Sequence, residues 1–248
     1  QQEYFAKCFG CVRFIYNKML EDKINYYKET GQMLHNTPAQ YKEQFPFLKE
    51  VDSLALANAQ LDLEQAYKNF FRDKSIGFPK FKRKKDKQSY TTNNQNGTIY
   101  IENGYIKLPK LKSRVKIKQH RQFTGKIKSC TISKTTTNKY YISILVEEEI
   151  KPLPKTDKKV GIDLGIKDFA VTSDGEVFEN PKWLRKTEKR LRKLNKDLSR
   201  KKLGSKNWEK TRLLLAKTYE KLANQRRDYL HKLSSKIINE NQVIVLED

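Results

Sequence analysis

Two segments near the start of the chain have apolar residues at every third or fourth position, which is the pattern of amphipathic helices. The first covers residues 4–28 and ends at a threonine–glycine pair. The second covers residues 51–71, with Asp52 or Ser53 as its cap. We therefore predict a helical module over residues 1–75.

In the next part of the chain, six short segments alternate apolar and polar residues, as β-strands do. Asn-Gly pairs at residues 96–97 and 103–104 provide turns between them. Several short strands at regular spacing favour a sandwich or a small barrel. The proline-containing stretch 151–155 is a stiff linker that ends this region, so we predict a small β-barrel over residues 76–156. The six predicted strands are residues 89–92, 98–101, 105–108, 115–117, 126–133 and 140–146.

One predicted strand, within residues 159–171, has a carboxylate in the middle of its apolar pattern. Branched aliphatic residues alternate there with Gly161, Asp163 and Gly165. An ionised aspartate on a buried strand is costly unless it is paired or coordinates a metal, and the glycines leave room for a backbone or a phosphate to approach. The Asp-Gly turn at 174–175 makes this the first strand of an antiparallel hairpin. The alternative, a carboxylate that only caps a turn, fits the central position of Asp163 less well.

The last third of the chain predicts two long helices and a strand. The helix over residues 182–202 has eleven Lys or Arg against two acidic residues and a narrow apolar stripe formed by Leu184, Leu191, Leu194 and Leu198. Gly204 separates it from a second helix over residues 206–240, so we predict an antiparallel helical hairpin within residues 182–240. Residues 242–246 form a continuous apolar run, which is typical of a strand buried in the middle of a mixed sheet, with Glu247 at its end.

Charge indicates the kind of partner. The 248 residues include 52 Lys and Arg against 29 Asp and Glu, a formal charge of +23. Such an excess implies a polyanion, usually nucleic acid. We find no apolar span of bilayer length, no lipidation signature and no signal peptide, so we expect no membrane partner. Both ends of the chain look cut.

Three cysteines are too few for a disulfide framework and favour a reducing cytoplasm. Cys8 and Cys11 have the spacing of a zinc half-site or a redox pair. Neither a second metal-binding pair nor a preceding strand accompanies them, so we interpret both as helix-packing residues.

Two carboxylates on adjacent strands lie close enough to hold a pair of divalent ions, because strands are about 4.8 Å apart. We predict that Asp163 and Glu247 are the catalytic residues and the metal ligands. Hard oxygen donors favour Mg²⁺ or Mn²⁺.

Basic residues next to aromatic ones, and basic residues on the first long helix, are the candidate contacts to nucleic acid. For each stretch the alternative is a solvated charged surface. The predicted contact residues are Lys80, Lys82, Arg83, Lys84, Lys85, Arg185, Lys189, Arg192, Lys193, Lys196 and Arg200.

Four stretches resemble one family in sequence and in order. Residues 160–170 (Val-Gly-Ile-Asp-Leu-Gly-Ile-Lys-Asp-Phe-Ala) are similar to the first RuvC motif of the TnpB/OrfB insertion-sequence proteins, relatives of the compact type V CRISPR nucleases. Residues 243–248 (Val-Ile-Val-Leu-Glu-Asp) resemble the second RuvC motif. Residues 9–17 and the Phe-Pro-Lys-Phe-Lys run at 78–82 also match. The resemblance covers essentially the whole chain.

This resemblance implies an α+β multidomain fold: a helical recognition module, a wedge-type barrel, and over residues 157–248 a partial RNase H-like (RuvC) mixed sheet with a long basic helical hairpin. It implies a guide RNA made from the element's own transcript, a double-stranded DNA target and RNA-directed DNA cleavage. The family's third RuvC carboxylate and its zinc ribbon, which binds Zn²⁺, should lie beyond Asp248. The chain is then a fragment of the pattern, and we expect it to be inactive by itself.

Two alternatives belong to other classes. An actin-like or sugar-kinase ATPase has a similar glycine-rich first strand, but hydroxyl residues would be expected where Ile166 and Lys167 stand. A non-catalytic nucleic-acid-binding relative would retain the carboxylates without using them.

Overall fold

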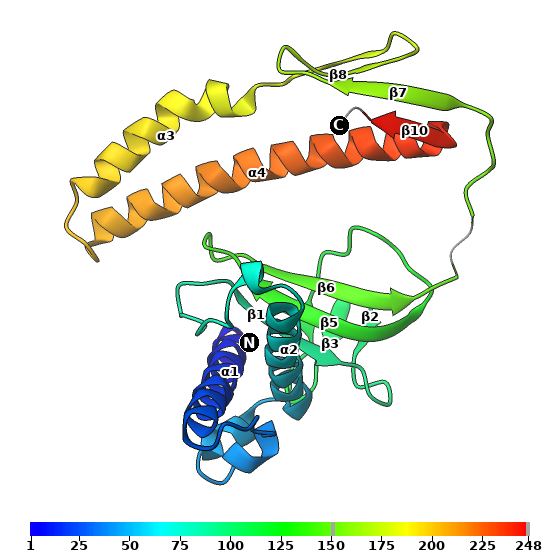
Figure 1. Ribbon diagram of the computed structural model, residues 1–248. Helices are drawn as coiled ribbons and strands as arrows, with labels where there is room; N and C mark the ends of the chain where they lie inside the picture. The colour runs from blue at the N-terminus through cyan, green and yellow to red at the C-terminus, as the bar shows by residue number, and fades with distance from the viewer. Residues whose placement is uncertain (150–151, 247–248) are drawn as a thin grey trace. The chain divides into compact units, whose positions relative to one another are not determined.

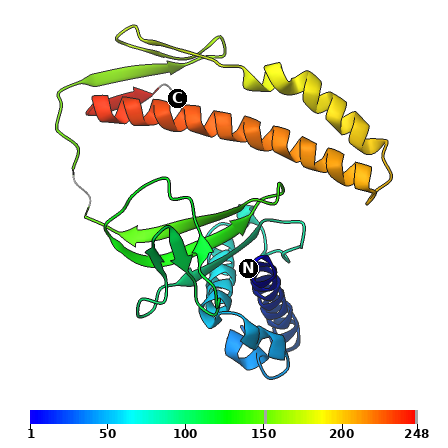
Figure 2. The same ribbon diagram turned by 180° about the vertical axis from the view of Figure 1, so that it is seen from behind.

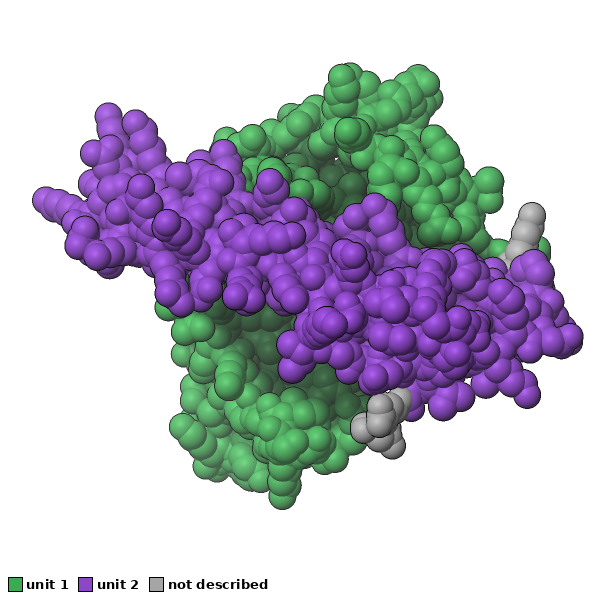
Figure 3. All heavy atoms as spheres, turned by 90° about the horizontal axis from the view of Figure 1, so that it is seen from above, with its two compact units in different colours: residues 1–149 green, residues 150–248 purple. Residues whose placement is uncertain are grey.

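The computed structural model describes residues 1–149 and 152–246, and Glu247 lies outside them. The chain forms two compact units, residues 1–149 and residues 150–248 (Figure 1, Figure 3). We describe each unit by itself.

The first unit begins with two long helices. Helix α1 covers Gln2–Thr30 and α2 covers Ser53–Arg72, which confirms both predicted helices with ends shifted by one or two residues. Asp52 is the cap of α2, where its side chain accepts a hydrogen bond from the backbone N–H of Leu54. Three short 3-10 helices lie near them: η1 (Pro38–Tyr41), η2 (Pro46–Glu50) and η3 (Lys74–Ile76).

Six strands follow, and each overlaps a predicted one. They form two three-stranded antiparallel sheets, one in the order β1-β5-β6 and the other β2-β3-β4. The strands are β1 (Gln88–Asn93), β2 (Tyr100–Glu102), β3 (Tyr105–Lys107), β4 (Val115–Lys116), β5 (Lys126–Lys134) and β6 (Tyr140–Glu147).

The predicted closed barrel is not formed by the described residues, because no strand of one sheet pairs with a strand of the other. The physical reason is that the larger sheet packs on helices. Tyr90 of β1 and Ile132 of β5 are buried in the same cluster as Phe5 and Phe9 of α1.

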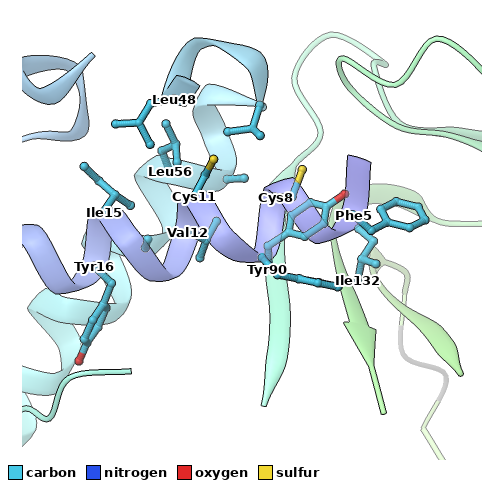
Figure 4. Packing of buried hydrophobic residues seen from close by; sticks show 14 of the residues in the cluster. Phe5, Cys8, Cys11, Val12, Ile15, Tyr16, Leu48, Leu56, Tyr90 and Ile132 are labelled. Atoms are coloured by element: carbon cyan, nitrogen blue, oxygen red, sulfur yellow. The ribbon is translucent and has the colours of Figure 1, made fainter. Parts of the chain in front are cut away.

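One hydrophobic core joins the helices and the sheets of this unit (Figure 4). Cys8 and Cys11 point from α1 into it, at 0% and 6% exposure, and Cys130 of β5 is also buried. All three thiols are free, and the burial of Cys8 and Cys11 confirms their interpretation as packing residues. The functional division into residues 1–75 and 76–156 stays a prediction.

The second unit has a four-stranded sheet in the order β10-β7-β8-β9. β7 (Lys159–Leu164), β8 (Asp168–Thr172) and β9 (Val177–Glu179) are antiparallel neighbours, and β10 (Val243–Leu246) pairs parallel with β7. Val160, Ile162 and Ala170 form a small core with Ile237 of helix α4, so α4 covers one face of the sheet (Figure 1).

Helices α3 (Trp183–Ser199) and α4 (Lys206–Glu240) form the predicted hairpin and lie side by side in both views (Figure 1, Figure 2). Leu191 and Leu194 of α3 pack with two leucines of α4, Leu215 and Leu222. Gly204 has a φ of 78° in the connection, a conformation that residues with a side chain rarely adopt.

Sequence predictions about β10 and about the apolar stripe of α3 were wrong. β10 is not buried in the middle of the sheet: within the described residues it pairs only with β7, and Val245 and Leu246 are 60% and 61% exposed. Leu184 does not join the apolar stripe of α3, since it is 51% exposed while the adjacent Trp183 packs on that cluster.

None of the helices within residues 1–149 and 152–246 combines the length and the apolar character needed to cross a bilayer.

Candidate carboxylate site and nucleic-acid interface

Asp163 lies on an exposed face of the second unit's sheet. In β7, Val160 and Ile162 are buried toward α4, and because side chains alternate along a strand, Asp163 points to the opposite face. Its cross-strand partner there is Val171 of β8, 36% exposed. The prediction of a buried carboxylate is therefore wrong: Asp163 is exposed and remains solvated, so it needs no partner to offset burial.

Among the described residues, the ladder between the parallel strands reaches the residue before Asp163. Its pairs run from Val243–Lys159 to Leu246–Ile162. In the chain, Asp163 follows Ile162 and Glu247 follows Leu246. Glu247 lies outside the described residues, so its approach to Asp163 stays a prediction.

The two glycines beside Asp163 have different surroundings. A Cβ atom on Gly165 would lie 2.9 Å from the backbone oxygen of Asp168, so this glycine allows the chain's own hairpin to close. A Cβ atom on Gly161 would make only ordinary contacts with Ser173, at 3.7 Å or more. Close packing of the hairpin, rather than space for a ligand, explains Gly165.

An exposed aspartate suits Mg²⁺ or Mn²⁺, which prefer carboxylate oxygens and keep several waters. Within residues 1–149 and 152–246, however, no group of three or more His, Cys, Asp or Glu side chains is placed to hold a metal. Asp163 is therefore a candidate for one metal ligand, and the metal site itself stays a prediction. The zinc prediction concerns residues beyond this chain.

The basic residues of α3 point away from α4. Leu191 and Leu194 face the partner helix, whereas all six predicted contact residues of this segment are exposed. Arg192 has an acidic neighbour, Glu188, at 2.6 Å on its own helix, and exposed pairs of this kind contribute little to stability. The helix therefore presents its positive charge to solvent. The six residues are Arg185, Lys189, Arg192, Lys193, Lys196 and Arg200.

The predicted contact residues of the first unit are not equivalent. Lys80, Lys84 and Lys85 are exposed. Arg83 is exposed too, but its backbone N–H donates to Asp86 and lowers the pKa of that carboxyl group, and its guanidinium lies 3.4 Å from the same residue. Lys82 is half-buried, with its ammonium 3.1 Å from Asp62.

The structure also shows a groove that sequence reasoning missed. It has a volume of about 260 Å³ and lies between α1, α2, β1 and the basic residues before β1. Its lining residues come from three separate stretches of the chain, so no local pattern could have indicated it. They include Arg13, Asn58, Asp62, Lys82, Gln88 and Tyr90.

Comparisons with known proteins agree on one family. Residues 142–248 match the OrfB family of insertion-sequence proteins, described as "Probable transposase". Residues 1–32 match a family described as "Helix-turn-helix domain". In the structure that segment is the single helix α1 with its C-terminal cap, not two helices.

Two curated relatives match the whole chain. A Streptomyces pristinaespiralis protein named "Putative RNA-guided DNA endonuclease" is 32% identical over 260 residues. An Escherichia coli protein named "Putative RNA-guided DNA endonuclease InsQ" is 36% identical over 258 residues. The chain spans 63% of the length of each. A "Virulence protein VsdF" of Salmonella dublin is 35% identical over 104 residues, which are 35% of this chain and 86% of that protein.

Proposed function

Because the chain belongs to the OrfB family of insertion-sequence proteins, we propose that the protein it represents is an RNA-guided DNA endonuclease. Its partners would be a guide RNA made from the element's own transcript and a double-stranded DNA target. The names of the two full-chain relatives support this proposal. The formal charge of +23 supports it independently, since a protein that binds two nucleic acids must neutralise many phosphates.

The second unit would be the nuclease domain, with an RNase H-like (RuvC) fold. Its mixed sheet supports this assignment, because three consecutive antiparallel strands are joined by a fourth strand parallel to the first. The first unit would supply the recognition module and the wedge-type domain.

Asp163 would be a metal ligand together with Glu247. The observation that supports this role most directly is the exposed position of Asp163 on β7, one residue after Ile162, which pairs with Leu246 of β10. Bound Mg²⁺ or Mn²⁺ would supply Lewis-acid activation of the phosphodiester and of a water nucleophile. The exposed basic face of α3 would hold the nucleic-acid backbone by its phosphates. A zinc ribbon would belong to the part of the full-length protein outside this chain.

Replacement of Asp163 in the full-length protein tests the proposal. With guide RNA and Mg²⁺, the parent should cut target DNA and Asp163→Ala should not, because one metal position is lost. Binding of the guide RNA should change little. Since Asp163 is exposed, the free energy of unfolding should change by no more than about 0.5 kcal/mol.

Asp174→Ala is the matched control, because Asp174 is an exposed aspartate in the β8–β9 turn of the same sheet. This variant should cut like the parent. Cleavage that survives in Asp163→Ala would show that the site is elsewhere. A parent protein that binds guide and target but does not cut with Mg²⁺ or Mn²⁺ would favour a non-catalytic relative.

A further inference from the structure

Residues 77–88, which we call the basic arm, are fastened to the helices of the first unit. At the start of the arm, the ring of Phe78 packs edge-on against Tyr67 and Phe70 of α2, with centroids 5.6 and 5.5 Å apart. Pro79 is buried. The arm therefore begins at a fixed position on α2, although residues 77–87 have no regular secondary structure.

Asn17 of α1 holds the middle of the arm. Its Nδ2 donates to the backbone oxygen of Lys82 at 2.9 Å, and its Oδ1 accepts from the backbone N–H of Lys82 at 2.8 Å. One side-chain amide thus satisfies both backbone groups of one residue that is 65 positions away in the chain. A side chain needs a donor and an acceptor side by side to do this, which a carboxamide has and a hydroxyl or carboxylate lacks at neutral pH.

The side chain of Lys82 also faces the helices. Its ammonium lies 3.1 Å from a carboxylate oxygen of Asp62 on α2 and 4.1 Å from the ring centroid of Tyr16 on α1. An ammonium in this position has both an ion pair and a cation–π contact. Lys82 is therefore an anchor of the arm, while the lysines on either side of it point to solvent.

The far end of the arm is held as well. Gln88 donates from Nε2 to the backbone oxygens of Lys84 and Asp86, at 2.7 and 3.1 Å, and accepts from Arg13 of α1 at 3.3 Å. Since the segment is fixed on both sides, Lys84 and Lys85 project from a defined turn. Phe81, 51% exposed, projects between the anchored residues.

We propose that Asn17 is a positioning residue for nucleic-acid binding, which acts by clasping the Lys82 backbone so that the arm presents Lys80, Lys84 and Lys85 in one fixed arrangement. The inference rests on the proposed function, in which the basic arm contacts nucleic acid. A fixed arm loses less conformational entropy on binding than a free loop does, so the clasp increases affinity without touching the ligand.

Asn17→Ala in the 248-residue chain tests the clasp, with binding of a fluorescently labelled single-stranded RNA followed by anisotropy. The variant should bind about threefold to tenfold more weakly than the parent, since two hydrogen bonds and the order of the arm are lost. Asn25→Ala is the matched control, because Asn25 is an exposed asparagine on the same helix. It should bind like the parent.

A double-mutant cycle separates positioning from a general loss of structure. In a background with Lys80→Gln, Lys84→Gln and Lys85→Gln, adding Asn17→Ala should have little further effect, because the arm no longer offers charge. An equal effect in both backgrounds would overturn the inference. If the three Gln replacements alone left the affinity for RNA unchanged, the arm would not contact nucleic acid. In that case the assumed role of the arm in the proposed function would fail, rather than the clasp by Asn17.

Amide hydrogen exchange of the parent chain keeps the inference falsifiable even if Asn17→Ala does not fold. The clasp predicts that the Lys82 amide exchanges more slowly than the amides of Lys84 and Lys85. Exchange at the same rate for all three would show that Asn17 does not hold the arm in solution.

Discussion

Cys8 and Cys130 lie with Tyr90 in the core of the first unit, where they function as small apolar side chains. Figure 4 shows Cys8 and Tyr90 in this core. Burial raises the pKa of the Cys8 thiol from its ordinary value of 9.0 to about 12, and that of Cys130 to about 12 as well. Burial also raises the pKa of Tyr90. A thiolate forms much less readily here than in solvent, so neither cysteine is suited to metal binding or to redox exchange at neutral pH.

These shifts predict a loss of stability in alkali. The folded chain keeps both thiols protonated up to about pH 12, whereas the unfolded chain loses those protons near pH 9. The contribution of the two protonated thiols to the free energy of unfolding is therefore complete below pH 9. It is lost as the pH rises toward 12, by up to about 1.4 kcal/mol per pH unit for each thiol. Urea unfolding followed by circular dichroism at pH 7.5, 9 and 10 measures it.

A variant with Cys8→Ala and Cys130→Ala is the control for this experiment. It should be less stable than the parent at pH 7.5, because it has small cavities. Between pH 9 and 10, however, its stability should fall less steeply. Equal pH dependence in both proteins would show that the thiols are not responsible.

Sequence reasoning at the scale of single residues identified the cap and the packing cysteines but misjudged the exposure of Asp163. The alternation around Asp163 correctly predicts a strand, and a strand pattern shows which residues share a face. It does not show whether a second layer covers the other face. Whether a second layer covers that face is decided by tertiary contacts, which the strand pattern does not contain. The apolar pattern alone was therefore interpreted as a strand with a buried carboxylate.

Helix α3 shows how an element can be predicted almost to its ends. Its leucines at helical spacing and the glycine that follows it predict the hairpin with α4, and the structure confirms both. The strand β10 was harder to predict, because four consecutive apolar residues are compatible with an edge or a centre. The order of the strands in the sheet, and not the local composition, distinguishes an edge strand from a central one.

The charge of α3 should control the salt dependence of nucleic-acid binding. Replacing Arg185, Lys189, Arg192 and Lys196 with Gln should flatten the plot of log affinity against log salt. For duplex DNA, each lost phosphate contact lowers the magnitude of the slope by about 0.9. Anisotropy titrations between low and physiological salt measure the slope.

The matched control keeps the charge at the same four positions by exchanging Arg for Lys and Lys for Arg. Its slope should equal that of the parent, because the slope depends on the number of phosphates neutralised rather than on the shape of the cation. An unchanged slope in the Gln variant would place the nucleic-acid path on another element.

At the scale of the whole molecule, the α+β composition could be predicted, while the architecture of the first unit could not. Six short strands suggested a barrel, because a closed barrel pairs the backbone N–H and C=O groups that an open sheet leaves unpaired at its edges. In the described residues the larger sheet instead packs on α1 and α2 through residues such as Tyr90 and Ile132, and the groove beside Asn58 results from that arrangement. Contacts between segments 40 or more positions apart are not visible in local periodicity.

The 248-residue chain by itself should bind nucleic acid but cut little or no DNA. Its basic arm and its α3 face both carry exposed basic residues, so we expect binding without further residues. Cleavage by the two-metal route needs several oxygen ligands that converge, and the described part of the chain contains no cluster of three candidate ligands. We therefore expect anisotropy to report binding of guide RNA, while a gel-based assay with Mg²⁺ shows no cleavage beyond that of the Asp163→Ala chain.

The full-length protein, assayed with the same guide and target, is the positive control. Robust Mg²⁺-dependent cleavage by the 248-residue chain, lost in its Asp163→Ala variant, would show instead that Asp163 and its neighbours within this chain suffice for catalysis.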